Sequence, residues 1–567
     1  MELLILLPLL HLAAAAPPRA ALDSGVVLGT ALGGVDEWVG IPFAAPPIGP
    51  RRWRSPAPPV PWTAPRAATS FGAECAQVAA RASGVAGAED CLFVNVWAPS
   101  AAAAPRGASL LPVLVWIHGG GFESGSSSLY NGTGIVRLAT SLATPIVVVS
   151  MNYRLSAFGF LHSPALAARD SGAGNLGLLD QRLALQWVQR NAAAFGGDAA
   201  RVTVAGESAG GGSISAHLAM PGSAGLFRGA IIESSSFAPA GATTALAAAA
   251  TFGDFARHSG CAAADSGASA GGDAVTACLL NKTTAELVRA KAQGAACCDF
   301  YAVLLPWAPV VTPAVLPVHP FDAVATDRDF LNGTALLHGV NRDEGFFFER
   351  AADYAMSAAT LLARWRAHYG ASSVDALRAL YDAPAPPSPA PGLYSPSFEA
   401  DQTALGDYWA LCAARRASRL LSPRGAPPAA LWHYYFQHPP ARDGVPFAYH
   451  SAEIRFVFQM EGSLDGADEL ALARAIGAYS IAFAAAGDPN AAAAAVRWPR
   501  VGASGNGTAL FLDVAARGGI AAVVGHKAAA CDGFWDDYLV RAMARCAEAW
   551  PCAAALRPAP PLPRRSY

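Results

Sequence analysis

The sequence has few charged residues and no block of one sign. Asp, Glu, Lys and Arg make up 14% of its 567 residues, and the formal net charge is −2. A nucleic-acid-binding protein needs a basic face to neutralise phosphates, and a protein that binds anionic membranes needs one as well. We therefore expect neither nucleic acid nor an anionic membrane as a partner.

Long apolar runs and zinc-type cysteine pairs are also missing. Beyond the N-terminus no run of about 18 consecutive apolar residues occurs, so we expect no membrane span. The ten cysteines include no Cys-x-x-Cys pair, which is the usual mark of a zinc site. No internal repeat is visible, and nothing in the composition predicts an oligomeric state.

The first residues read as an export signal. A Leu-rich run over residues 3–12 is followed by four alanines, the pattern of a signal peptide with a small-residue cleavage site. We predict a signal peptide over residues 1–16 and a secreted protein, or one in the lumen of the secretory pathway. The run has no positive start and Pro17 follows it, so an uncleaved apolar N-terminus is the alternative. Four Asn-x-Thr sequons predict glycosylation: Asn131, Asn281, Asn332 and Asn506.

Buried strands alternate with helices along most of the chain. Hydrophobic residues make up 53% of the sequence, which is ample for a large core. Short apolar runs predict strands at residues 113–117, 146–150, 202–205, 227–234, 335–340, 432–436 and 510–512. This alternation predicts a parallel sheet with its ligand site at the carboxyl ends of the strands. We predict one α/β domain over residues 21–545, with helical insertions at 243–287 and 351–380, and a Pro-rich tail over 546–567.

The segment over residues 201–220 predicts a nucleophile. A short strand leads into Gly-Glu-Ser-Ala-Gly at residues 206–210, and a small, apolar, helix-like stretch follows. A serine at the apex of a tight strand-to-helix turn is a nucleophile elbow, whose glycines allow the helix to lie close to the strand. The turn would lift Ser208 Oγ from the backbone and place the Ala209 N–H at a helix N-terminus, where it can bind an oxyanion.

A second Gly-x-Ser-x-Gly pattern occurs at residues 267–271. No apolar strand precedes it, and its neighbours are Ala, Gly, Ser and Asp, so we interpret it as a loop. Ser208 is therefore the predicted nucleophile and Ser269 is not.

A serine hydroxyl needs a base that a third group orients, and in this kind of fold the order is Ser, acid, His. The strand at 335–340 ends in Asn-Arg-Asp-Glu-Gly, so either Asp343 or Glu344 is the candidate acid. His450 is the candidate base, because it follows an irregular stretch and precedes a helix-like segment. His438, next to a Pro pair, is its main rival. By order alone the choice stays open, while His118, His217 and His433 have ordinary structural interpretations.

The chain resembles the type B carboxylesterase and cholinesterase family. The matching motifs follow the family order and span residues 25 to 540. They are Gly-Ile-Pro-Phe-Ala-Ala-Pro-Pro (40–47), Glu-Asp-Cys-Leu-Phe-Val-Asn-Val (89–96), Gly-Gly-Gly-Phe (119–122), Asn-Tyr-Arg-Leu (152–155), Gly-Asn-Leu-Gly-Leu-Leu-Asp-Gln (174–181), the elbow, Asp-Glu-Gly (343–345), His450 with Glu453, and Gly-Asp-Pro-Asn (487–490).

This resemblance implies an α/β-hydrolase fold, with a large, mostly parallel central sheet flanked by helices. It implies a catalytic triad of Ser208, Glu344 and His450. It also implies an oxyanion hole built from the N–H groups of Gly120, Gly121 and Ala209. Its reaction would be hydrolysis of a small-molecule carboxylic ester through an acyl-enzyme, and it would need neither cofactor nor metal.

The family framework further implies three disulfides: Cys75–Cys91, Cys261–Cys278 and Cys412–Cys531. Four cysteines stay unassigned, with three possible pairings: Cys297, Cys298, Cys546 and Cys552. Counting back from residues 309–311, the acyl-pocket positions would be Val303 and Leu305, whose small side chains leave room for groups longer than acetyl. Nearby Phe300, Tyr301 or Trp307 could refill that pocket.

The sequence predicts a broad esterase rather than an acetylcholinesterase. Cholinesterases hold the quaternary ammonium on an aromatic face in the first disulfide loop, and residues 76–90 here contain no aromatic residue. Two alternatives are a lipase acting on acylglycerols and a cholinesterase-like adhesion protein without catalysis. The intact Ser208, Glu344 and His450 argue against the adhesion protein.

Overall fold

The computed structural model describes residues 16–548 except 80–83, 102, 104–108, 263–271, 291–305, 328–329, 382–392, 423–429, 492–495 and 503–507. Among these residues the main sheet has 11 strands in the order β18-β17-β16-β15-β12-β11-β9-β10-β8-β4-β3. The strands, in chain order, are β3 (Thr30–Ala31), β4 (Val35–Pro42), β8 (Phe93–Pro99), β9 (Leu111–Ile117), β10 (Val147–Met151), β11 (Gly197–Glu207), β12 (Gly229–Glu233), β15 (Ala335–Asn341), β16 (Leu431–Phe436), β17 (Ala509–Leu512) and β18 (Ala521–Val523).

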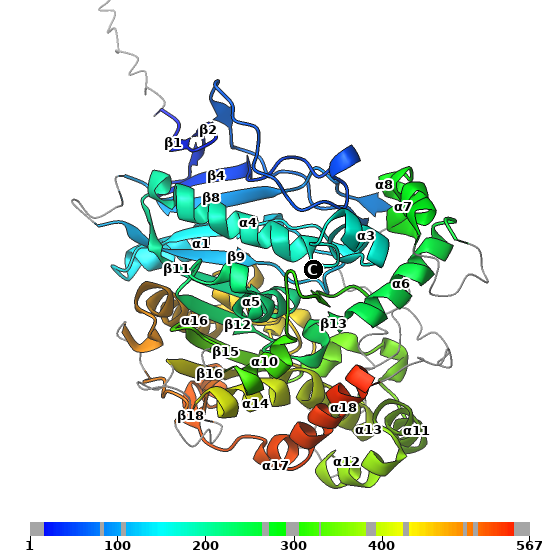
Figure 1. The fold of residues 1–567 in the computed structure, drawn as a ribbon. Helices are drawn as coiled ribbons and strands as arrows, with labels where there is room; N and C mark the ends of the chain where they lie inside the picture. The colour runs from blue at the N-terminus through cyan, green and yellow to red at the C-terminus, as the bar shows by residue number, and fades with distance from the viewer. Residues whose placement is uncertain are drawn as a thin grey trace, which may run out of the picture.

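The centre of this sheet is parallel and its edges are antiparallel. Neighbours from β10 through β9, β11, β12, β15 and β16 to β17 pair in parallel. β8, β4 and β3 at one edge and β18 at the other pair antiparallel. Figure 1 shows the N-terminal strands at one end of the sheet and the C-terminal helix α18 (Asp536–Glu548) near the other end. The predicted α/β sheet is confirmed.

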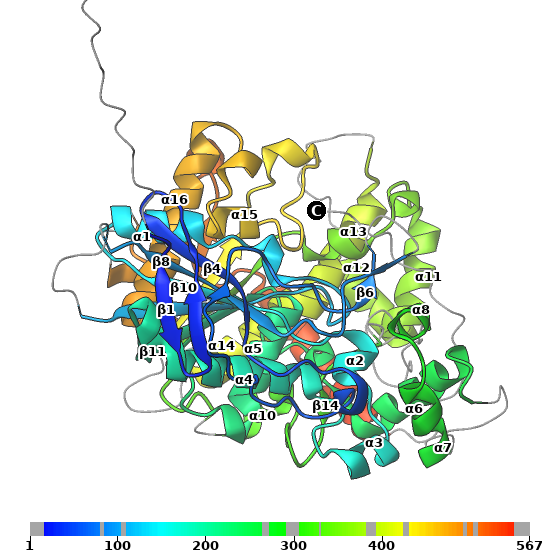
Figure 2. The ribbon, with the colours of Figure 1, turned by 90° about the horizontal axis from the view of Figure 1, so that it is seen from above.

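Helices cover both faces of the sheet. Figure 2 shows α1 (Thr133–Ser141) and α16 (Gly466–Ala486) on one side, and α4 (Leu176–Asn191) and α10 (Pro320–Thr326) on the other. α5 (Ala209–Ala219) lies on the α4 side and packs against β11 and β12. The described insertions are helical as predicted: α6 (Ala245–His258), α7 (Asp273–Leu280), α8 (Thr284–Arg289), α11 (Ala358–Tyr369) and α12 (Val374–Tyr381).

The remaining helices and short strands lie around this frame. The helices are α2 (Ser156–Phe160), α3 (Pro164–Arg169), α13 (Pro396–Gly406), α14 (Cys412–Leu421), α15 (Ile454–Val457) and α17 (Ala528–Ala530). The short strands are β1 (Arg19–Leu22), β2 (Gly25–Leu28), β5 (Arg66–Ala67), β6 (Gln77–Val78), β7 (Val85–Ala86), β13 (Thr243–Thr244) and β14 (Val310–Val311).

Strand β9 separates two hydrophobic cores. Its residues Val113, Val115 and Ile117 belong to the core under α4 and α5, while Leu114 and Trp116 belong to the core under α1 and α16. All five are at most 3% exposed. Side chains alternate between the two faces of a strand, so a strand that is buried on both faces reads as an unbroken apolar run.

Helix α16 is long and apolar enough to cross a membrane, by length and composition only, and it is the one such helix among the described residues. Its apolar window is 56% buried within the fold. Its contacts with β9, β11 and β12 are those of a core helix of the sheet.

Three disulfides join the pairs that the family resemblance implies: Cys75–Cys91, Cys261–Cys278 and Cys412–Cys531. The third ties the start of α14 to the segment before α18, across 119 residues of sequence. Cys297, Cys298 and Cys552 lie outside the described residues, and Cys546 falls within α18.

Candidate active site

The predicted elbow is present. β11 ends at Glu207, Ser208 follows with φ 54° and ψ −123°, and α5 begins at Ala209. A positive φ at a residue other than glycine is strained and is typical of functional turns. No larger residue fits at Gly206 or Gly210, because an added Cβ would lie 2.7 Å and 2.0 Å, respectively, from the carbonyl oxygen of Ile117.

The helix after the elbow offers a backbone donor. Ala209 is the first residue of α5, and the first N–H groups of a helix have no acceptor within it. They also lie at the positive end of the helix dipole. The predicted oxyanion donor at Ala209 therefore lies where a helix favours negative charge.

The glycine loop, residues 118–125, follows β9 and passes directly against Ser208. An added Cβ on Gly119 would lie 3.0 Å from Ser208 Cβ and 2.8 Å from the carbonyl oxygen of Glu207. Gly120 has φ +105° and Gly121 has φ +62°, backbone angles that residues other than glycine rarely adopt. The backbone of the predicted oxyanion loop thus lies so close to the elbow that a side chain at Gly119 would not fit between them.

Glu344 and His450 form a buried pair. Glu344 Oε2 lies 2.7 Å from His450 Nδ1, and Oε1 accepts a hydrogen bond from the Asn341 N–H at 2.7 Å. The turn that carries Glu344 packs closely against α13, because an added Cβ on Gly345 would lie 2.0 Å from the carbonyl oxygen of Gln402. The pair joins the end of β15 to the loop before α15.

Asp343, the other acid that residue order allows, has a different role. Its carboxylate accepts a hydrogen bond from the Ala448 N–H at 2.8 Å and pairs with Arg342 at 2.7 Å. It therefore holds the loop that leads to His450, and Glu344 is the acid that contacts the imidazole.

The second nitrogen of His450 faces the elbow. Nε2 lies 3.1 Å from Oε1 of Glu207, the residue before Ser208, and Ser451 donates a hydrogen bond to the same oxygen. His450 is 3% exposed. Burial lowers the pKa of His450 below its ordinary value, although the Glu207 charge opposes this. The neutral imidazole, which is the form that accepts a proton, is therefore favoured.

Burial raises the pKa of Glu344 to about 8, although the hydrogen bond from the Asn341 N–H opposes this. Burial also raises the pKa of Glu207 to about 8 against the opposing charge of His450. The protein interior thus disfavours charge on both partners of His450.

Glu207 and Glu344 form a carboxyl cluster with two further acids. Sequence reasoning assigned neither of the two a function. Glu233 ends β12 directly beside Glu207 in the parallel register, and Glu453 receives a hydrogen bond from Asn341 Nδ2. Burial raises the pKa of Glu453 to about 8 and that of Glu233 well above its ordinary value. The position of Glu233 at a strand's carboxyl end was a signal that could have identified it.

The back of the cluster lines a small cavity between the sheet and α16. Glu233, Glu453 and Tyr434 line it, and each has a side-chain oxygen with no hydrogen-bond partner among the described residues. The carboxyl cluster therefore reaches from the elbow through to the α16 side of the sheet.

An aromatic wall surrounds His450. The rings of Trp409, Phe347 and Phe348 lie with their centroids 4.8, 5.4 and 5.6 Å from the imidazole. Trp409 comes from the turn before α14, far from His450 in sequence. No spacing in the sequence indicates this contact, because it depends on tertiary packing between two separate segments of the chain.

His438 lies in a separate site. Its Nε2 is 2.9 Å from Glu469 Oε1 and its Nδ1 is 3.1 Å from Asp513 Oδ1, so both nitrogens already have carboxylate partners. The other histidines with structural interpretations are buried at 1%, 2% and 3% exposure: His118, His217 and His433.

Several predicted positions lie outside the described residues: Val303, Leu305, Phe300, Tyr301, Ser269, Asn506 and residues 1–15. The other three sequon asparagines are exposed: Asn131, Asn281 and Asn332.

Comparison with known proteins agrees with this arrangement. The family model described as "Carboxylesterase family" matches residues 16–519. The para-nitrobenzyl esterase of Bacillus subtilis is 35% identical over 494 residues, which is 84% of this chain and 91% of that protein. The secreted triacylglycerol lipase LIP1 of Gibberella zeae is 33% identical over 368 residues, 59% of each chain.

A solved structure titled "PNB esterase" superimposes with a TM-score of 0.74 at 32% identity. It covers 92% of this chain and 100% of its own. The sheet order, the elbow and these matches lead to one conclusion: the chain belongs to the carboxylesterase family and is a carboxylic ester hydrolase of the α/β-hydrolase fold.

Proposed function

We propose that the protein hydrolyses small carboxylic esters through an acyl-enzyme on Ser208, with His450 as general base and Glu344 as the acid that orients it. The observation that carries this proposal is the 2.7 Å contact between Glu344 Oε2 and His450 Nδ1, with Nε2 turned toward the residue before the strained Ser208. Nucleophile, base and orienting acid in this order are the requirements for acyl transfer.

The reaction proceeds in two halves. Ser208 Oγ attacks the ester carbonyl carbon while His450 Nε2 takes the hydroxyl proton, and a tetrahedral oxyanion forms. The C–O bond to the alcohol breaks, and the alcohol leaves with the proton from His450. A water molecule, deprotonated by His450, then attacks the acyl carbon, and the carboxylic acid leaves as Ser208 Oγ regains its proton.

The oxyanion would be held by the N–H groups of Gly120, Gly121 and Ala209. The close approach of the glycine loop to Ser208 and the position of Ala209 at the start of α5 support this assignment. Each such donor contributes about 3 kcal/mol to stabilisation of the transition state.

The defining test is Ser208→Ala. Hydrolysis of a p-nitrophenyl ester should fall by roughly 10⁴-fold or more, because triad members act as a unit. Ser269→Ala is the matched control and should keep full activity. Activity that survives in Ser208→Ala and disappears in Ser269→Ala would overturn the assignment.

For the substrate we propose uncharged esters with acyl groups longer than acetyl. The absence of an aromatic residue from residues 76–90 and the small side chains at Val303 and Leu305 support this proposal. The measurement is kcat/KM for acetylcholine against uncharged acetyl and butyryl esters. A clear preference for acetylcholine over both would contradict it.

A second candidate is lipase activity, which the similarity to a secreted triacylglycerol lipase favours. Emulsified triglyceride, assayed beside soluble p-nitrophenyl esters of rising chain length, separates the two candidates. Turnover that rises sharply above the solubility limit of the substrate would favour the lipase.

We propose that the protein is secreted, with a signal peptide over residues 1–16, a catalytic domain over residues 21–545 and a tail over 546–567. Three disulfides and the secreted relative support an oxidising location. N-terminal sequencing of protein collected from the medium of expressing cells tests the cleavage site, and an uncleaved Met1 would contradict it.

A further inference from the structure

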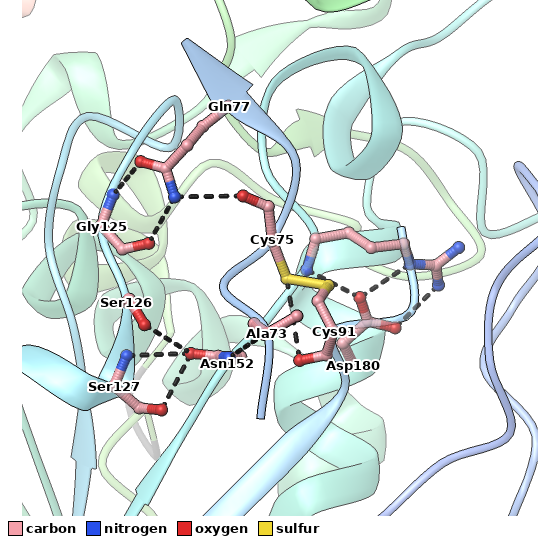
Figure 3. Close-up of a disulfide and its surroundings, with 10 residues drawn as sticks. Ala73, Cys75, Gln77, Cys91, Gly125, Ser126, Ser127, Asn152 and Asp180 are labelled. Atoms are coloured by element: carbon pink, nitrogen blue, oxygen red, sulfur yellow. Dashed lines mark hydrogen bonds and ion pairs between the residues drawn. A yellow bond between two sulfur atoms is a disulfide. The ribbon is translucent and has the colours of Figure 1, made fainter. Parts of the chain in front are cut away.

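Two buried carboxamides connect the first disulfide segment to the end of the glycine loop (Figure 3). Gln77 belongs to β6, two residues after Cys75. Its Oε1 accepts a hydrogen bond from the Gly125 N–H at 3.0 Å, and its Nε2 donates to the carbonyl oxygens of Gly125 and Cys75, both at 3.0 Å. One side chain thus holds both polar groups of the Gly125 backbone.

Asn152 makes the second connection. Its Oδ1 accepts hydrogen bonds from the N–H and the hydroxyl of Ser127, at 2.9 and 2.8 Å. Its Nδ2 donates to the carbonyl oxygen of Ala73 at 3.0 Å. Because Asn152 directly follows β10 and Cys75 is bonded to Cys91, the contacts anchor residues 125–127 to the sheet and to the disulfide.

Gly125 is the residue that closes the glycine loop. Its φ is +108°, and an added Cβ would lie 2.5 Å from His118 Nδ1 and 2.6 Å from the carbonyl oxygen of Gly119. The end of the loop therefore packs on its beginning. Between the two ends, the N–H groups of Glu123 and Ser124 both donate to the carbonyl oxygen of Gly120 at 3.0 Å.

This closed loop carries the N–H groups of Gly120 and Gly121. Backbone donors stabilise an oxyanion only when they are held at 2.7–3.1 Å from its position. Three consecutive glycines have wide conformational freedom, so the loop needs an outside contact to hold it. Gln77 and Asn152 supply that contact from elements that the disulfide and the sheet fix.

We propose that Gln77 is a positioning residue for the oxyanion hole, an inference that rests on the proposed function above. Its carboxamide holds Gly125, Gly125 holds His118 and Gly119, and these fix the direction of the donors at Gly120 and Gly121. The first disulfide loop thereby helps to position the oxyanion donors, although it lacks the aromatic residue that holds the quaternary ammonium in cholinesterases.

Gln77→Met tests the proposal, because Met has a similar length and makes none of the three hydrogen bonds. We expect kcat for p-nitrophenyl butyrate to fall roughly 10- to 100-fold, less than the ~10²–10³-fold of a lost donor. KM should stay within about 2-fold, because the donors act on the transition state. Inhibition by a trifluoromethyl ketone, which forms a tetrahedral oxyanion on the serine, should weaken by the same factor as kcat/KM.

Gln189→Met is the matched control. Gln189 is a half-buried carboxamide on α4 that donates to the carbonyl oxygens of Ala199 and Leu226 at 3.0 and 2.9 Å, and neither of these hydrogen bonds involves the glycine loop. It should lose stability to a similar degree and keep the wild-type kcat. Equal loss of kcat in both variants would overturn the proposal and leave Gln77 a structural residue.

Gln77→Glu is a second variant for the same kinetic measurements if Gln77→Met folds poorly. It keeps an acceptor for the Gly125 N–H but places a carboxylate oxygen against the carbonyl oxygens of Gly125 and Cys75, so kcat should fall at least as far as in Gln77→Met. Wild-type kcat and inhibitor affinity in a folded Gln77 variant would overturn the proposal. Failure of the proposed function is distinguishable, because it appears as activity retained by Ser208→Ala.

Discussion

His450 and His438 lie twelve residues apart and form two sites of similar geometry. Each is buried, and each contacts two carboxylates through its two ring nitrogens, at 2.7 and 3.1 Å for His450 and at 2.9 and 3.1 Å for His438. Geometry at the imidazole therefore does not distinguish the proposed base, His450, from the structural histidine, His438.

The carboxylates distinguish the two sites. Burial tends to raise the pKa of Glu469, but hydrogen bonds from the Ala441 N–H, His438 and the Asp465 N–H outweigh burial and lower it. Burial instead raises the pKa of Glu344 and of Glu207 to about 8. Backbone donors thus stabilise the charge at the His438 site, whereas at the His450 site burial dominates, which is typical of functional sites.

Alanine at each histidine should give the largest contrast. His450→Ala should lower kcat by about 10⁴-fold, since it removes the proposed general base. His438→Ala should keep kcat within a few-fold and lower the free energy of unfolding by about 1–3 kcal/mol, because Glu469 and Asp513 both lose their contact with the ring. Steady-state kinetics and urea unfolding measure the two effects. A folded His438→Ala protein as inactive as His450→Ala would remove the distinction.

The disulfide Cys412–Cys531 offers a change that alters neither histidine nor the carboxyl groups that contact them. Replacing both cysteines by alanine should lower the free energy of unfolding by about 4–5 kcal/mol in the chain-entropy model, because the closed loop is long. The folded fraction should keep its kcat per active site, titrated with an organophosphate. A loss of kcat in fully folded protein would mean that the bond positions the site.

Glutamine at the two acids should change stability in opposite directions. Glu344 has a raised pKa in the fold, so its ionisation costs stability as pH rises above the unfolded value of ~4.3 toward 8. Glu344→Gln should therefore gain stability relative to wild type between pH 5 and 8 while it loses activity.

Glu469 has a lowered pKa, so its contribution is present above the unfolded value and is lost as pH falls through the folded value. Glu469→Gln should lose about 1–2 kcal/mol at pH 7, with the difference shrinking in acid, and should stay active. Urea midpoints from pH 4 to 8 measure both variants. Shifts of the same sign in both would show that the two acids are alike.

The pH profile should give the smallest effect. Because burial holds the pKa of His450 below 6.5, the acid limb of kcat/KM should have its midpoint below pH 6.5. The charge of ionised Glu207 raises that pKa, but the pKa of Glu207 itself is raised to about 8, so only a small ionised fraction is present over the acid limb. Glu207→Gln should therefore move the midpoint only slightly lower. Glu469→Gln is the control and should leave the midpoint unchanged. A midpoint that moves upward in Glu207→Gln would show that Glu207 does not act as a charge on His450.

Contiguous features of this molecule could be predicted from the sequence and dispersed ones could not. The strand–turn–helix around Ser208 occupies one segment, so its glycines and apolar runs predict the geometry directly. The choice between Asp343 and Glu344 depends on which carboxylate meets a loop 106 residues away, and residue order left it open. Family resemblance selected Glu344, and the structure brings that side chain to His450.

The same reasoning explains what was missed. Glu233 belongs to the site because β12 pairs in register with β11, and register is set by packing that no single strand encodes. Trp409 contacts His450 through tertiary packing that the spacing of the two residues does not indicate.

The two cores that share β9 affect how mutations at this strand should combine. Val115 and Trp116 are adjacent in sequence, yet their side chains contribute to packing on opposite faces of the sheet. Contacts within one core couple energetically, whereas side chains without shared partners contribute nearly additively. Distance along the chain is therefore a poor guide to energetic coupling here. Substitutions on the α16 face and on the α5 face of β9 should change the free energy of unfolding nearly additively.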